Sequence, residues 1–92
     1  LGLYVEPLTS EKAQELGHPE LKAVVVTKVA PHSPAASIVS PGDVILSVNR
    51  EKVTSVQSYH KLLAKAKKQP RALLHVLDAR TGRTVYKLVP NK

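Results

Sequence analysis

The chain has 92 residues, no cysteine and a formal net charge of +7. This length fits one domain, and a chain without cysteine can form no disulfide framework, thiolate metal site or thiol nucleophile. Phe and Trp are absent and Tyr occurs three times, so the core must be built from aliphatic side chains. No apolar run approaches the ~20 residues that a membrane-crossing helix needs, so we expect no membrane insertion.

The N-terminal segment predicts a short strand followed by a short helix. Leu3–Glu6 is predicted to be a short strand, and Pro7 ends it. Thr9 or Ser10 is suited to cap a helix that begins there. Gly17 is suited to end that helix, because glycine favours the position after a helix C-terminus.

The next segment predicts a strand, a short helix and a turn. Ala23–Ala30 is rich in β-branched residues, which favours a strand. Ser33–Ala36 begins with a serine followed by proline, which is typical of a capped short helix. Ser40–Asp43 contains Pro-Gly-Asp, which indicates a turn.

Val44–Asn49 predicts a second strong strand. Alternation places Val44, Leu46 and Val48 on one face of this strand and Ile45 on the other. The sequence from Asn49 to Lys52 then predicts a tight reversal that leads into Val53.

The C-terminal half predicts the longest helix and a closing hairpin. Ser55 is suited to cap a helix over residues 56–68, which carries one apolar stripe. The stripe consists of Tyr59, Leu62, Leu63 and Ala66. Residues 72–77 and 85–89 predict two strands, and Thr81-Gly82 lies at the centre of the turn between them.

Serine, histidine and aspartate are all present, but not in a catalytic pattern. The chain has no Gly-x-Ser-x-Gly motif, Ser33 is explained as a helix cap, and Asp43 lies in a turn. The four histidines are far apart and lack metal-ligand spacing: they are His18, His32, His60 and His75. The sequence therefore predicts no catalytic residue, no metal site and no cofactor.

Basic residues are concentrated between His60 and Arg71. Lys61, Lys65 and Lys68 fall on one face of the predicted long helix. No aromatic residues are interleaved to stack on bases, so we expect no nucleic-acid partner, and such a binder is the weakest alternative. A solvated outer face is favoured, and a long-range preference for acidic peptides or surfaces is the next alternative.

Three motifs together resemble the signature of the PDZ family. These are Ser33-Pro34-Ala35-Ala36, then Pro41-Gly42-Asp43-Val44-Ile45-Leu46, then Val48-Asn49 with Val53. The resemblance implies an α+β fold: a PDZ-like, partly open β-barrel or sandwich of five to six mostly antiparallel strands. One long and one or two short helices would cap it, and residues 1–92 would form a single domain cut from a larger protein.

The chain departs from the family pattern at three places. Ser37–Ser40 replaces a usual Gly-Leu pair before the turn, Ala23 stands where a glycine often begins the strand, and Arg50 replaces a frequent turn glycine. These departures change loops and leave the match over nearly the whole chain.

The opening segment Leu1–Thr9 resembles that of PDZ domains in HtrA/Do-like (DegP/DegQ-type) serine proteases. The resemblance implies a substrate-recognition or regulatory module of a periplasmic or cell-envelope endopeptidase, with the catalytic domain outside this chain. The parent would be a homo-oligomer and the fragment alone a monomer. The alternatives are a stand-alone scaffolding domain, or a PDZ domain of another membrane-linked protease or of a secretion protein.

A PDZ domain binds C-terminal or extended peptides as an added β-strand. On this sequence the resemblance makes Leu3–Glu6 the receiving strand, Leu1-Gly2-Leu3 the loop for the terminal carboxylate, and the long helix the opposite wall. An apolar last peptide residue is expected from the leucines of the loop. His60 would hydrogen-bond the peptide or gain charge as pH falls; the alternative is an exposed residue without a partner. The expected peptide-binding residues are Leu1, Gly2, Leu3, Tyr4, Val5, Val56, His60, Leu63 and Ala64.

Overall fold

Six strands form one open antiparallel sheet in this computed structural model, which describes residues 2–78 and 80–90. The strand order is β1-β2-β3-β5-β6, and β4 pairs with β3 beside this path. The elements are β1 (Leu3–Pro7), α1 (Ser10–Glu15), β2 (Val24–Val29), β3 (Val44–Val48), β4 (Glu51–Lys52), α2 (Val56–Ala66), β5 (Arg71–Leu77) and β6 (Thr84–Pro90). The predicted α+β class with a partly open sheet is confirmed.

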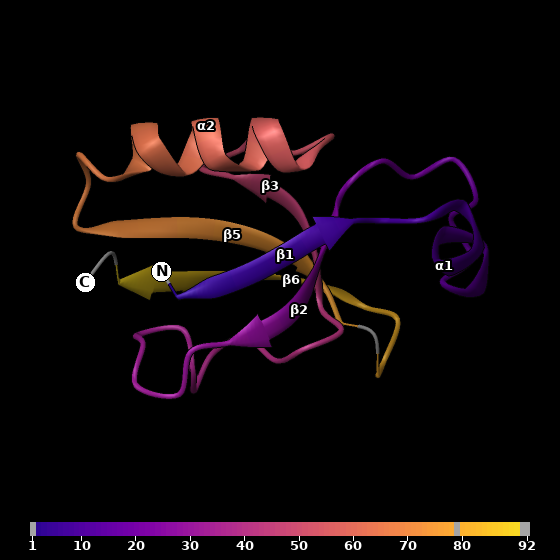
Figure 1. Cartoon of the computed structure of the whole chain (residues 1–92), viewed down its shortest axis with the longest axis horizontal. Helices are drawn as coiled ribbons and strands as arrows, with labels where there is room; N and C mark the ends of the chain where they lie inside the picture. Colours follow the sequence, from indigo (N-terminus) through magenta and orange to yellow (C-terminus); the bar gives the residue numbers. More distant parts are fainter. Residues whose placement is uncertain (1, 79, 91–92) are drawn as a thin grey trace.

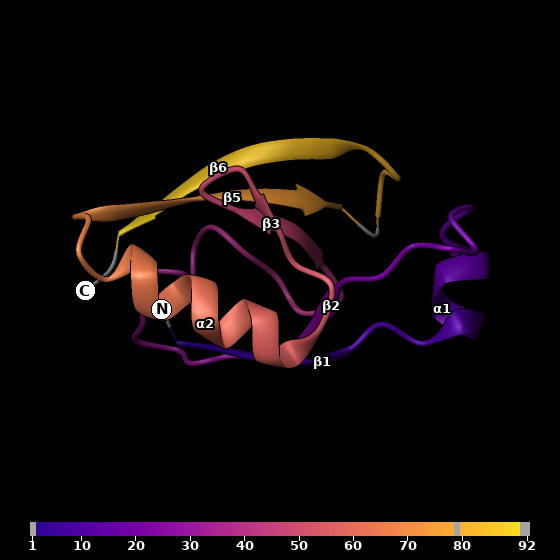
Figure 2. The same ribbon diagram turned by 90° about the horizontal axis from the view of Figure 1, so that it is seen from above.

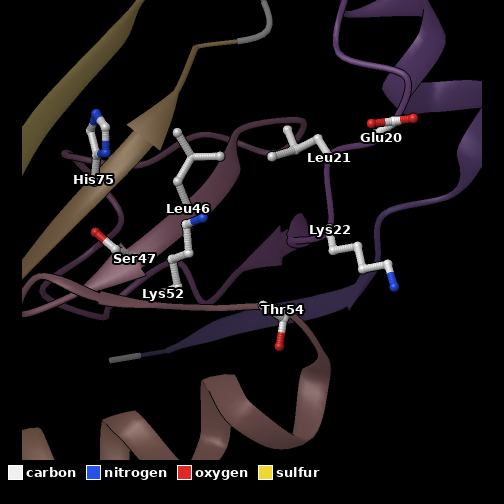
Figure 3. A pocket seen from close by; sticks show the side chains of 8 residues that line it. All are labelled: Glu20, Leu21, Lys22, Leu46, Ser47, Lys52, Thr54 and His75. Carbon is white, nitrogen blue, oxygen red and sulfur yellow. The ribbon is translucent and has the colours of Figure 1, made fainter.

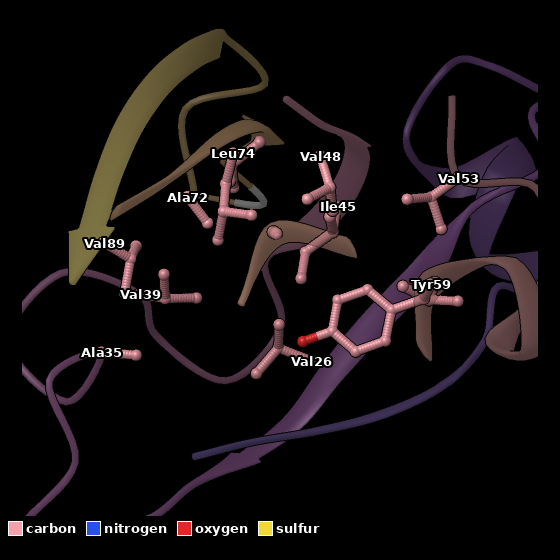
Figure 4. Packing of buried hydrophobic residues seen from close by; sticks show 13 residues of the cluster. Val26, Ala35, Val39, Ile45, Val48, Val53, Tyr59, Ala72, Leu74 and Val89 are labelled. Carbon is pink, nitrogen blue, oxygen red and sulfur yellow. The ribbon is translucent and has the colours of Figure 1, made fainter. Parts of the chain in front are cut away.

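The long helix and the sheet enclose one main core. In Figures 1 and 2, α2 runs beside β3 and β5 on one side and β1 on the other, while α1 lies beyond the far end of β1. Tyr59 of α2 is fully buried and its ring points into the cluster beside Val26 and Ile45 (Figure 4). The core is otherwise aliphatic, as the composition predicted.

Two of the three predicted helix starts are confirmed by their caps. The Ser55 side chain accepts a hydrogen bond from Ser58 N, and the Ser58 side chain accepts one from Ser55 N, which is a reciprocal capping box. Thr9 caps α1 by accepting from Lys12 N at 3.1 Å. The predicted stripe on α2 is also confirmed, since its four residues are buried or packed against the main core.

The predicted short helix at Ser33–Ala36 is wrong. This segment consists of turns, in which Ser33 N bonds Ala30 O and Ala36 N bonds Ser33 O. The Ser33 hydroxyl donates to Ala30 O at 2.7 Å and does not cap a helix. Pro34 lacks a donor and the Pro-Gly-Asp turn follows within a few residues, so too few consecutive bonds form to make a helix.

The predicted face assignment in β3 is confirmed for Val44, Leu46 and Ile45 but is wrong for Val48. Ile45 and Val48 belong to the main core, whereas Val44 lies in a second cluster with Ala23, and Leu46 packs against that cluster. The pairing of β3 with β5 is irregular between Ile45 and Ser47. This bulge shifts the register by one residue, so side chains beyond it change faces.

Candidate functional site

The outer edge of β1 is free, because β1 pairs only with β2 and ends the strand order. Gly2 O accepts from Ala30 N at 2.8 Å, and Leu8 N donates to Ala23 O at 3.1 Å. Antiparallel strands alternate between residues that bond the partner and residues that face away. Leu3, Val5 and Pro7 of β1 therefore face away from β2. Pro7 has no N–H to donate, so Leu3 and Val5 are the residues that offer both a free N–H and a free C=O.

The free edge lies next to α2, and apolar side chains from both elements meet at the core. Leu3 and Val5 of β1 are half-buried and pack against the main cluster, as do Val56 and Leu63 of α2. Four of the expected peptide-binding residues are thus brought together. They form an apolar floor between an open strand edge and a helix.

His60 and Ala64 follow Val56 along the same side of α2, at one-turn spacing, and both are exposed. The His60 ring meets the Tyr59 ring edge to face, with centroids 5.4 Å apart. Among the described residues His60 has no hydrogen-bond or ion-pair partner, so its ring nitrogens are open to solvent.

Tyr4 is not brought to the other expected residues. Its side chain is 57% exposed, and the Lys28 Nζ lies 5.8 Å from its ring centroid, on the opposite face of β1 from Leu3 and Val5. Its carbonyl accepts from the Thr27 hydroxyl at 3.1 Å. Leu1 lies outside the described residues.

Gly2 precedes the free edge in a conformation that favours glycine. Its φ is +80°, and a Cβ at this position would lie 2.6 Å from the Ser33 Oγ and overlap the Ser33 Cβ. Successive backbone N–H groups near a left-handed residue can form an anion-binding concavity. Ala30 and Ser33 hold this loop in place, a role that the sequence reasoning missed because it assigned Ser33 to a helix cap.

A separate cavity of about 460 Å³ lies between β3, β4, β5 and the loop before β2. Figure 3 shows side chains from these four segments around it, including His75, Leu46 and Leu21. The His75 ring stacks on the Tyr86 ring at 4.3 Å. The lining of this cavity contains no cluster of three potential metal ligands, and no such cluster exists elsewhere among the described residues. No described helix could span a membrane.

An open antiparallel sheet whose edge strand lies beside a long helix is an arrangement used by domains that bind peptides through β-strand addition. The PDZ domain family model matches residues 25–76, which is more than half of the chain. The chain therefore belongs to the PDZ domain family.

Its curated relatives are bacterial serine endoproteases. The chain is 43% identical over 65 residues to a probable periplasmic serine endoprotease DegP-like from Chlamydia pneumoniae, a match that covers 68% of this chain and 13% of that protein. It is 34% identical over 64 residues to the protein of the same name from Bartonella henselae, covering 70% and 13%. The chain thus spans only a small part of these relatives.

Solved structures that resemble the chain over 98% of its length include two that are bound to peptides or ligands. The HtrA-type protease AlgW with decapeptide has a TM-score of 0.74 and 31% identity, with 27% of that chain covered. The HtrA3 PDZ domain bound to a phage-derived ligand has a TM-score of 0.70 and 22% identity, with 79% covered, and supports the fold alone. The chain is thus a PDZ domain homologous to those of HtrA/DegP-type proteases and is not the protease domain.

Proposed function

We propose that this domain captures C-terminal or extended peptide segments by adding them as a strand to the free edge of β1, opposite α2. The observation that carries this proposal is that the backbone groups of Leu3 and Val5 face outward while their side chains form part of the apolar floor. Main-chain bonds to these residues would supply affinity, and side-chain contacts would supply selectivity. The resemblance to an HtrA-type protease with a decapeptide supports the same mode.

The peptide terminus would lie at the Gly2 end of the edge. The positive φ of Gly2 suits a loop whose N–H groups converge on a carboxylate. Leu3 would line the pocket for the last side chain, and an apolar residue fits that lining. Residues nearer the peptide's N-terminus would pass His60 and Ala64, whose exposure leaves them accessible.

The proposed context is the substrate-recognition or regulatory part of a periplasmic HtrA/Do-like serine endopeptidase. The names of the curated relatives support both the enzyme class and the location. Tethering a substrate tail raises its effective concentration at the catalytic domain without new contacts there. The parent protein would be a homo-oligomer, and this domain alone would be monomeric.

The direct test compares three peptides that differ only at the C-terminus: Val with a free carboxylate, Asp with a free carboxylate, and Val as the amide. We expect a dissociation constant in the micromolar range for the Val acid, roughly −8 kcal/mol, and weaker binding of the other two. Calorimetry gives the constants. Tighter binding of the Asp peptide contradicts an apolar pocket, and equal binding of the amide contradicts carboxylate capture.

Main-chain pairing is tested by methylating single peptide nitrogens. Only every second N–H group of a strand faces its neighbour. Methylating a peptide nitrogen that faces β1 should therefore abolish binding, and methylating the next nitrogen along the peptide should leave binding unchanged. Equal effects of methylation at both kinds of nitrogen contradict strand addition.

His60→Ala should change peptide selectivity. Lys68→Ala, at an exposed residue that follows the same helix, serves as the control. Equal behaviour of the two variants contradicts a role of His60 in the groove.

A further inference from the structure

A basic hollow of about 700 Å³ lies on the flank of α2 that faces β4. It is lined by Glu51, Lys52, Ser58, Lys61, Leu62 and Lys65. At about 100° per helical residue, Lys61 and Leu62 project from a different side of α2 than Val56 and His60. The hollow is therefore separate from the proposed peptide groove, with the helix as a wall of both.

Lysines outnumber acidic groups in this hollow. Lys65 Nζ lies 3.3 Å from each carboxylate oxygen of Glu51, and both side chains are largely exposed, so this pair contributes little and can exchange partners. Lys52 and Lys61 have no acidic partner among the described residues. Two ammonium groups are therefore left to bind an added anion, and a third is only weakly held.

The floor and the near end of the hollow favour an acidic ligand with an apolar side chain. Leu62 is half-buried and packs against the main core, so it offers apolar contact at the base. Only the Ser58 end of the hollow lies in the first turn of α2, where the helix dipole is positive and no acidic residue occurs, whereas Lys65 lies in the last turn. The Ser58 hydroxyl is already used in the capping box.

We propose that this hollow binds an acidic polypeptide segment at a site independent of the β1 groove. Lys61 and Lys65 are one helical turn apart, with about 5–6 Å between Cβ atoms. In an extended chain, residues two apart lie about 6.6–6.8 Å apart on the same face. Carboxylates at alternate residues therefore match the spacing of the two lysines. Leu62 lies between these lysines along the helix and offers apolar contact to the peptide beside them.

The lining favours a polypeptide over a nucleic acid. None of the residues that line the hollow is aromatic, so it offers no platform for stacking bases. The net charge of +7 would attract acidic segments over a long range. The site gives a binding role to Lys61 and Lys65, which the sequence analysis assigned to a solvated face of the helix.

The test is an NMR titration of the domain with the doubly capped peptide acetyl-Glu-Ser-Glu-Ser-Leu-amide. The amide end removes the terminal carboxylate, which keeps the peptide away from the Gly2 loop. We expect shifts at Lys52, Lys61 and Leu62, and weaker binding as salt rises, because exposed charges are screened. The matching Gln-Ser-Gln-Ser-Leu peptide should cause no such shifts.

Three variants separate site binding from general attraction. Lys61→Gln with Lys65→Gln should weaken binding about tenfold or more, and Glu51→Gln should strengthen it about twofold to threefold by freeing Lys65. Arg80→Gln with Arg83→Gln makes the same charge change in the β5–β6 turn and should have little effect. The circular dichroism spectrum of each variant checks that it folds.

Several outcomes overturn the proposal. Equal weakening by the two charge-matched double variants means that only net charge acts. Equal binding of the Gln peptide removes the role of carboxylates, and shifts along β1 place the ligand in the groove. Tighter binding of single-stranded DNA at the same residues assigns the hollow to a nucleic acid.

Discussion

Gly2 and Ser33 are so close that a side chain at residue 2 would collide with the Ser33 side chain. This contact joins the loop before β1 to the turn after β2, and Gly2 also holds Ala30 through its carbonyl. Gly2→Ala should destabilise the domain by at least about 2 kcal/mol, because a positive φ and a steric clash act together. Urea unfolding measures this, and peptide titration should show weaker carboxylate binding.

Gly17→Ala is the matched control for this substitution. Gly17 has a φ of +81°, nearly that of Gly2, but apart from its neighbours along the chain nothing lies within 4 Å of the position that a Cβ would occupy there. It should therefore cost only the backbone term, about 1 kcal/mol. Adding Ser33→Gly to the Gly2→Ala variant should recover part of the lost stability. If Gly2→Ala and Gly17→Ala reduce the stability equally, the contact with Ser33 does not contribute to the loss.

Arg50 lies in a turn that would be more stable with glycine. Asn49 and Arg50 have φ values of 50° and 70°, the pattern of a type I′ turn between β3 and β4. Arg50→Gly should stabilise the domain by about 0.5–1 kcal/mol, since the relief of strain exceeds the added chain entropy. In urea unfolding, Asn49→Gly should instead destabilise it, because the Asn49 side chain accepts from Leu73 N at 2.8 Å. A loss of stability in Arg50→Gly contradicts this reasoning.

The Tyr59 hydroxyl is buried and has no hydrogen-bond partner among the described residues. A buried donor without a partner is costly, so Tyr59→Phe should leave the stability unchanged or raise it by about 1 kcal/mol. Thermal unfolding at neutral pH measures this. A loss above about 1 kcal/mol would mean that the hydroxyl makes a stabilising bond.

Burial also raises the pKa of Tyr59 from 10.0 to about 12. The unfolded chain therefore releases this proton at a lower pH than the folded chain does. The contribution of the neutral Tyr59 to the free energy of unfolding is complete below pH 10 and is lost as pH rises toward 12. The wild type should lose about 1.4 kcal/mol per pH unit more than Tyr59→Phe across this range. Parallel pH profiles of the two proteins would contradict the assignment.

Lys87 holds the turn segment after β2 against β6. Its Nζ donates to Ile38 O at 2.7 Å and lies 3.9 Å from the nearly buried Asp43 Oδ2, which accepts from Ser40 N at 3.0 Å. Lys87→Met should cost about 1–3 kcal/mol, because it leaves the Asp43 carboxylate without its cation. Adding Asp43→Asn should restore part of this in urea unfolding; a double variant no more stable than Lys87→Met rules out the charge as the cause.

Much of the fold could be predicted because it depends on interactions within a few residues. The caps at Thr9 and Ser55, the stripe on α2 and the strand segments follow from side-chain hydrogen bonding and hydrophobic periodicity. The PDZ motifs extended these predictions to the arrangement of the sheet. The sequence also placed Lys61 and Lys65 on one helix face.

The tertiary structure decided what depends on residues far apart in the chain. The bulge in β3 moved Val44 and Val48 to different clusters, which alternation cannot predict because the register is set by β5. Ser33 contacts Gly2 only because β1 and β2 pair. The basic hollow likewise requires β4 to bring Glu51 and Lys52 beside α2. Strand pairing and packing select these contacts, and no local sequence pattern records which distant residues will meet.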